Sequence, residues 1–169
     1  MQEIENAYLM LARQVQRSIE NDDLIALRDV SVLIDFKRLT FVEIDEENGR
    51  KVAKPITVYA AEHGSVDVMS FLLEEGCDIN ARDSYGNTPL MCAVGMDRIE
   101  MISFLLKQPN IQIFMKNYYG ETIGSIAYLN NDTDVIAYLS KLPQPIDISP
   151  ALSSENGISD TNNTSHLVS

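Results

Sequence analysis

The 169-residue sequence has few of the residues that carry metal-dependent or nucleophilic chemistry. It contains two histidines, two cysteines and no tryptophan. A zinc site needs several histidine, cysteine or carboxylate ligands at close spacing, and one of the two histidines, His166, lies in a polar C-terminal tail. Two cysteines are too few for a disulfide framework, and a glycine-rich phosphate-binding loop is missing. We therefore expect no enzymatic activity, no cofactor and no metal.

Basic residues and long apolar runs are also scarce. The 13 lysines and arginines are outnumbered by 25 aspartates and glutamates, which gives a formal net charge of −12. Nucleic acids and anionic membranes are bound through clustered basic side chains, so neither is an expected partner. No apolar run approaches the roughly 18 residues of a membrane-spanning helix, and no N-terminal secretory signal is visible. The sequence predicts a cytoplasmic protein whose acidic surface favours a basic partner or serves solubility alone.

What the sequence does contain is an internal repeat. The stretch from Asp83 to Val94 returns in weakened form from Asn117 to Tyr128, so that the turn glycine recurs after 34 residues. Two further sets of residues recur after 33 and then 34 positions: Ala60, Ala93 and Ala127, and Leu72, Leu105 and Leu139. A fixed period of this length is typical of small helical units that bury their apolar faces only by stacking on one another.

The repeated motif resembles the ankyrin repeat. Thr88-Pro89-Leu90 follows the turn glycine, and Gly64 to Ala81 matches the second half of the ankyrin pattern almost residue for residue. Two departures stand out, because Met91 occupies the usual histidine position and Ile123-Gly124 replace Pro-Leu in the later copy. The resemblance implies an all-α solenoid of stacked helix-turn-helix repeats with β-hairpin connections.

Local chemistry supports the same elements. Thr88 can accept a hydrogen bond from the first turn of a helix in which Pro89 takes the first position. The apolar set Val68, Phe71 and Leu72 recurs as Met101, Phe104 and Leu105 at helical spacing, which predicts a buried stripe.

The N-terminal third follows the pattern less closely. It predicts two antiparallel helices broken at 21–23, and then a hairpin with a tight, positive-φ turn at Asn48-Gly49. The domain prediction is a repeat unit over 1–142 followed by a disordered polar tail over 143–169, of which the 143–150 part is expected to lie extended over the last repeat. Within the unit we expect a divergent N-terminal cap at 1–45 and repeats at 46–82, 83–116 and 117–142.

The ankyrin register also implies a binding surface. Residues beside the turn glycine and at the end of each first helix are expected to face the concave side, where they are not needed for packing of the core. They are Glu62, His63, Ser84, Tyr85, Asn87, Met96, Tyr118, Tyr119, Glu121, Leu129 and Asn130. Tyrosine and methionine are enriched at binding hot spots. The alternative is that the three tyrosines only pack on one another at the repeat edges.

The leading functional hypothesis is a monomeric, non-enzymatic module that binds another protein through this surface. One version is an effector delivered into a host cytosol by a type IV system, because the polar tail carries an aliphatic residue, Leu167, third from its end. A second version is a viral or cellular inhibitor or scaffold built on the same repeats. The remaining alternative is a cryptic enzyme that uses a pair of Cys92 and His63.

Overall fold

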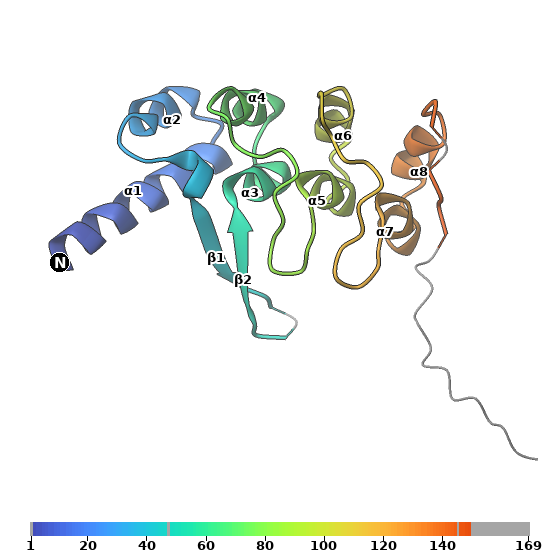
Figure 1. Cartoon of the computed structure of the whole chain (residues 1–169), viewed down its shortest axis with the longest axis horizontal. Coiled ribbons are helices and arrows are strands. Elements are labelled where there is room, and N and C mark those ends of the chain that lie inside the picture. The colour runs from blue at the N-terminus through green and yellow to red at the C-terminus, as the bar shows by residue number, and fades with distance from the viewer. Residues whose placement is uncertain (1, 47, 145, 150–169) are drawn as a thin grey trace, which may run out of the picture.

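The computed structural model describes residues 2–46, 48–144 and 146–149, and these form a row of helix pairs that lie side by side (Figure 1). The first of them comprises α1 (Gln2–Glu20) and α2 (Leu24–Ser31), and a short 3-10 helix, η1 (Phe36–Arg38), follows. The hairpin strands are β1 (Thr40–Ile44) and β2 (Lys51–Pro55). The remaining pairs are α3 (Ile56–His63) with α4 (Val66–Glu74), α5 (Pro89–Gly95) with α6 (Ile99–Leu105), and α7 (Ile123–Leu129) with α8 (Thr133–Leu139). The described part of the chain is thus mostly helical.

The first helix pair breaks where the polar run predicts it. Asp22 takes a positive φ of 61°, and the carboxylate of Asp23 accepts a hydrogen bond from the Ala26 amide at 3.0 Å to begin α2. Val15 and Ile19 on α1 are fully buried with Leu27 on α2. This pair closes one end of the helix row.

The hairpin forms at the predicted place with a longer turn than predicted. The Asp45 amide donates to the Arg50 carbonyl and the Gly49 amide to the Asp45 carbonyl, both at 2.8 Å. Among the described residues of this loop only Gly49 has a positive φ, of 69°. Gly49 therefore has the predicted positive φ, but the turn is less tight than predicted, because the loop closes at Asp45 and Arg50.

The inner helices α3, α5 and α7 stack side by side and carry the repeated alanines (Figure 1). Ala60, Ala93 and Ala127 are each 0% exposed, since the missing side-chain bulk lets neighbouring helices approach closely. Hydroxyl caps start these repeats: Thr88 accepts from the Met91 amide at 3.3 Å, and Thr122 forms a capping box with Ser125. The outer helices contribute the buried leucines, Leu72, Leu105 and Leu139.

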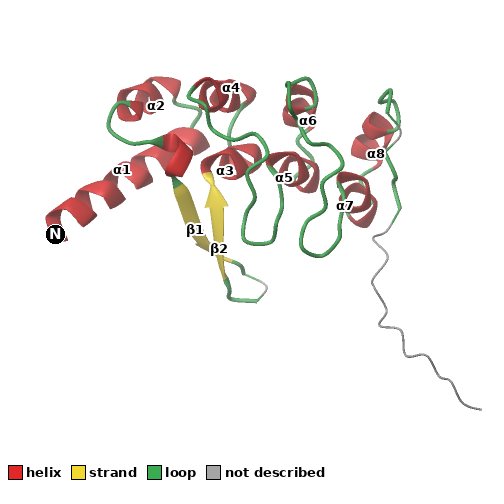
Figure 2. Ribbon diagram, in the orientation of Figure 1, coloured by secondary structure: helices red, strands yellow, loops and turns green. Residues whose placement is uncertain are grey.

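The connections between repeats are turns held by one buried polar side chain each. Asp83 accepts from the amides of Tyr85 and Asn87, both at 2.8 Å. Thirty-four residues later, Asn117 accepts from the amides of Tyr119 and Glu121 at 3.0 and 2.9 Å. Within the described ranges, strand pairing is confined to β1 and β2, so the β-hairpin connections expected at the later repeats are formed by these side-chain-bonded turns (Figure 2).

Residues 146–149, placed by the sequence in the tail, lie against α7. Ile146 and Ile148 are half-buried against the core. A Cβ built on Gly124 would lie 2.0 Å from the carbonyl oxygen of Asp147, so only glycine permits this approach. The unusual Ile123-Gly124 sequence therefore has a structural reason. The rest of the predicted tail, 150–169, lies outside the described residues.

Two truncations separate the parts of this tail. Ending the chain after Ser149 should leave the melting temperature unchanged, whereas ending it after Leu142 should also remove the apolar cover of α7. Loss of two half-buried isoleucines is expected to cost about 1–2 kcal/mol. Urea unfolding of the two truncated chains measures the difference, and equal stabilities would show that residues 146–149 contribute nothing to the core.

Candidate functional site

Large exposed side chains gather at the tips of the turns and at the ends of the inner helices. Tyr118 and Tyr119 on a turn are 68% and 63% exposed, and Met96 and Leu129 at the ends of α5 and α7 are 55% and 57% exposed. Asn130 follows Leu129, and its side-chain amide donates a hydrogen bond to the Gly95 carbonyl of the preceding repeat at 3.1 Å. We call the surface formed by Met96, Tyr118, Tyr119, Leu129 and Asn130 the recognition face.

The tip tyrosines are exposed and also anchored. The ring centroids of Tyr85 and Tyr119 lie 6.0 Å apart, and the Arg82 guanidinium lies 4.9 Å from the centroid of the Tyr118 ring. The amide of Tyr118 donates to the Tyr85 carbonyl at 2.9 Å, which joins one turn to the next. Tyr118 and Tyr119 therefore pack on neighbouring side chains and still expose more than half of their surface.

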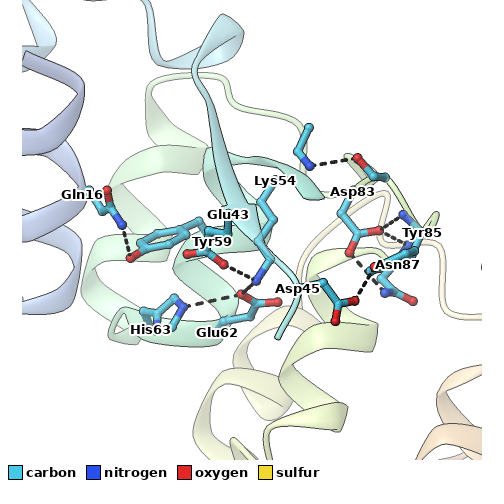
Figure 3. Close-up of polar contacts among 12 residues, drawn as sticks. Gln16, Glu43, Asp45, Lys54, Tyr59, Glu62, His63, Asp83, Tyr85 and Asn87 are labelled. Atoms are coloured by element: carbon cyan, nitrogen blue, oxygen red, sulfur yellow. Dashed lines mark hydrogen bonds and ion pairs between the residues drawn. The ribbon is translucent and has the colours of Figure 1, made fainter. Parts of the chain in front are cut away.

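Tyr85 differs from the other two because its hydroxyl is already bound. It donates to the carboxylate of Asp45 (Figure 3) and accepts from the side-chain amide of Asn48 at 3.3 Å. This contact raises the pKa of Tyr85, chiefly through the hydrogen bond to Asp45. Tyr85 thus ties the β1–β2 hairpin to the following turn.

Three other predicted site residues stabilise the turns. Ser84 pairs with Ala53 of β2 through its hydroxyl at 2.8 Å, although its side chain lies at the surface. The Asn117 side-chain amide donates to Asn87 at 2.9 Å and to Glu121 at 2.7 Å. These residues hold the tips in register, and their polar atoms are engaged within the chain.

Glu62 is not the free surface residue that the repeat register predicts. Its side chain is 6% exposed, and its carboxylate lies 2.6 Å from the ammonium group of Lys54. The same ammonium lies 2.7 Å from Glu43, and His63, whose side chain is 40% exposed, lies 3.5 Å from Glu62 (Figure 3). The hairpin brings Lys54 over α3, a contact that the spacing of the repeats does not reveal.

This cluster has the ligand types of a cation site. The ligand atoms of Glu43, Glu62 and His63 lie within 4.8 Å of one another. The Lys54 ammonium already lies between the two carboxylates. The cluster is therefore an internal ion pair. Burial lowers the pKa of Lys54, but hydrogen bonds to Glu43 and Glu62 outweigh it and the net shift is upward.

A second polar contact joins α1 to α3. The Tyr59 hydroxyl accepts from the side-chain amide of Gln16 at 2.9 Å (Figure 3) and donates to the carboxylate of Glu20. Burial, followed by the hydrogen bond to Glu20, raises the pKa of Tyr59 well above its ordinary value of 10.0.

Alkaline pH should therefore destabilise the fold. A group whose pKa is raised in the folded state contributes stability below its unfolded pKa, and this contribution is lost as pH rises. For Lys54 and Tyr59 the ordinary values are 10.5 and 10.0, so unfolding free energy should fall from about pH 10 upward. Urea titrations between neutral and alkaline pH test this, and Tyr59→Phe should show a shallower decline. An identical decline in wild type and Tyr59→Phe would contradict a part played by Tyr59.

The two cysteines lie in the core. Cys77 and Cys92 are 7% and 8% exposed. Burial, with a contribution from Glu75, raises the pKa of Cys77 to about 11, and burial likewise raises that of Cys92. A thiol with a raised pKa is protonated at neutral pH and is a poor nucleophile. Among the described residues, no hydrogen bond links Cys92 to His63, so the structure gives the proposed pair no support.

Acidic groups lie beside the recognition face. A hydrogen bond to Asp132 raises the pKa of the exposed Asp97, which directly follows Met96. The pKa of Asp132 is lowered, first by the hydrogen bond from the Val135 amide that begins α8. Two carboxyl groups in such contact favour a cationic neighbour.

Other exposed apolar residues were not among the predicted site residues. Tyr128 on α7 is 49% exposed, and Val42 and Ile44 on β1 are 61% and 58% exposed. The alternating pattern of β1 was the available signal for the last two, because one face of a two-stranded hairpin has no helix to cover it.

The comparisons with known proteins agree with this architecture. A family model described as ankyrin repeats in three copies matches residues 30–117 and 57–151, and the chain belongs to the ankyrin-repeat family. Ankyrin repeats are generally non-enzymatic modules that bind other proteins. No helix in the described part of the chain has the length and apolar character needed to cross a membrane.

Individual relatives cover different shares of the chain. The I-Kappa-B like protein G2 of Microplitis demolitor bracovirus is 32% identical over 118 residues, which are 69% of this chain and 68% of that protein. Mouse Rabankyrin-5 is 33% identical over 88 residues, 51% of this chain and 7% of that protein. An ankyrin repeat protein of fowlpox virus is 40% identical over 65 residues, 38% of this chain and 12% of its own length. The chain thus spans only a small fraction of the latter two relatives.

Proposed function

We propose that this chain binds a partner protein through the recognition face and that it acts by occupying that partner. The observation that carries the proposal is the set of four large side chains, Met96, Tyr118, Tyr119 and Leu129, that stay more than half exposed on consecutive repeats. Tyrosine and methionine side chains are enriched at binding hot spots. The backbones of Tyr118 and Tyr119 are fixed by the turn hydrogen bonds, and Met96 and Leu129 lie at the ends of helices, so few degrees of freedom are lost on binding.

The partner's binding segment should carry basic groups. The chain has a net charge of −12, Asp97 directly follows Met96, and its carboxyl group contacts that of Asp132. A lysine or arginine placed between these carboxyl groups would relieve their repulsion. Association should then be faster at low salt, because opposite charges steer the encounter.

Among the two versions of this function, an inhibitor or scaffold is the better supported. The bracovirus relative, named I-Kappa-B like, aligns over about two thirds of both chains, so its architecture is comparable in extent. This version places the protein in the cytoplasm of the cell in which its partner resides. The effector version depends on a translocation signal around Leu167, which lies outside the described residues.

A capture experiment with matched variants tests the binding face. Tyr118→Ala/Tyr119→Ala/Leu129→Ala removes three exposed side chains, and Val32→Ala/Leu33→Ala removes two on the outer-helix side that are 83% and 66% exposed. Truncation of hot-spot residues typically costs about 2 kcal/mol or more of binding. Partner recovery should fall at least about tenfold for the first variant and stay unchanged for the second. Equal recovery by both variants would remove the proposal.

A further inference from the structure

The β1–β2 hairpin has one covered edge and one uncovered edge. On the outer side of β2, the Ala53 carbonyl accepts from the Ser84 amide at 3.1 Å, and the Ala53 amide donates to the Ser84 hydroxyl at 2.8 Å. The turn of the next repeat therefore continues the sheet past β2. Within the described residues, the sheet ends at β1 on the other side.

The register fixes which backbone groups of β1 point outward. The Leu39–Ile56 and Asp45–Arg50 pairs are hydrogen-bonded at 3.2 and 2.8 Å at the two ends of the antiparallel ladder. Hydrogen-bonded and non-hydrogen-bonded pairs alternate in such a ladder, so the even-numbered residues of β1 turn their amides and carbonyls away from β2. The described hydrogen bonds include none to these outward groups of Thr40, Val42 and Ile44.

The same three residues are also exposed through their side chains. Val42 and Ile44 are 61% and 58% exposed, and Thr40 lies at the surface beside them. The opposite face of β1 is occupied, since Phe41 packs on Tyr59 with ring centroids 4.7 Å apart. An exposed edge of β-branched residues is a template for pairing with another strand.

The charges flanking β1 indicate which strand can pair with its open edge. Exposed basic residues, Lys37 and Arg38, precede the strand, and acidic residues, Asp45 and Glu46, follow it. An antiparallel copy of the same segment reverses this order, so that each basic end meets an acidic end. The segment is complementary to itself in both charge and side-chain shape.

We propose that β1 pairs with β1 of a second copy of this chain around a two-fold axis at Val42. Thr40 then lies opposite Ile44 of the second copy, and Val42 lies opposite its own equivalent. All three residues of each strand use their outward amides and carbonyls, and the two hairpins form a four-stranded antiparallel sheet. Arg38 lies next to Glu46 of the second copy at both ends.

The two-fold axis separates the two helix rows. Helix α3 joins the hairpin at Pro55, which pairs with Thr40 at the N-terminal end of β1. The two-fold axis places the second solenoid at the opposite end of the sheet, where the first hairpin has its turn. Because the contact is small and each chain carries a charge of −12, the dimer is concentration-dependent, in contrast to the monomer expected from the sequence.

Sedimentation velocity of the full chain over a wide concentration range tests this pairing. Val42→Pro removes the outward amide and no hydrogen bond of the hairpin itself, and it should weaken dimerisation by about tenfold or more. Val42→Thr keeps the amide and the branched side chain and should dimerise like wild type. Circular dichroism melts check that both variants fold.

Exchanging the charges at the two ends of β1 gives the most specific test of the pairing. Arg38→Glu and Glu46→Arg should each sediment mainly as monomers, because each places like charges at both ends of the pairing. Mixing the two variants restores opposite charges at both ends and should restore a dimer. A wild-type chain that stays monomeric throughout, a dimer that is indifferent to Val42→Pro, or a mixture that remains monomeric would each overturn the proposal.

Discussion

Lys54→Met should destabilise the protein by about 3 kcal/mol, at the low end of the range for breaking a buried ion pair. The ammonium of Lys54 lies within 2.7 Å of both Glu43 and Glu62, and the Glu62 side chain is 6% exposed. Removing the cation leaves two carboxylates facing each other without a counter-charge. Because β1, β2 and α3 meet at this point, the loss should loosen the hairpin as well.

The double variant Lys54→Met/Glu62→Gln is the matched control. It removes the buried negative charge together with the cation and should recover a large part of the lost stability. Urea unfolding of the two variants and wild type measures the coupling. A Lys54→Met variant that is as stable as wild type would show that the ion pair contributes nothing to the stability of the fold.

Leu105→Ala should cost about 2–5 kcal/mol, the range for truncating a buried leucine. Leu105 is 0% exposed on α6, in the middle of the stack, and neighbouring repeats cannot collapse onto the cavity without moving their backbones. The loss should lower the urea midpoint. The repeats on both sides should also lose stability, because each repeat is stabilised by contacts with its neighbours.

Leu129→Ala is the same chemical change on the surface. Leu129 is 57% exposed at the end of α7 and should cost well under 1 kcal/mol of stability. The pair of leucines thus separates core from recognition face by one substitution type. Equal destabilisation by the two variants would mean that Leu129 is a packing residue.

The repeat core was predictable because its signals are periodic and local. The recurrence of Ala60, Ala93 and Ala127 and the Thr88-Pro89 helix start depend only on neighbours in sequence and on a fixed repeat length. All three alanines are buried and Thr88 caps α5. Such features follow from side-chain size and backbone hydrogen bonding, which a sequence states directly.

The contacts that were missed join segments far apart in the chain without any periodic pattern. Lys54 reaches Glu62 because the hairpin folds over α3, and Tyr85 reaches Asp45 because the hairpin lies beside the next turn. For the tail, the prolines indicated an extended segment over the last repeat, but they gave no sign that Ile146 and Ile148 pack on the core. Gly124 was noticed as a departure from the repeat, but its reason lies in the chain that crosses it.

Oxidative footprinting of methionines, in the complex with a captured partner, shows whether the partner covers the recognition face. Met96 lies on the face and is 55% exposed, and Met10 on α1 is 75% exposed and outside it. The account predicts that the partner slows oxidation of Met96 and leaves that of Met10 unchanged. Protection of Met10 with Met96 still oxidised at its free rate would contradict it.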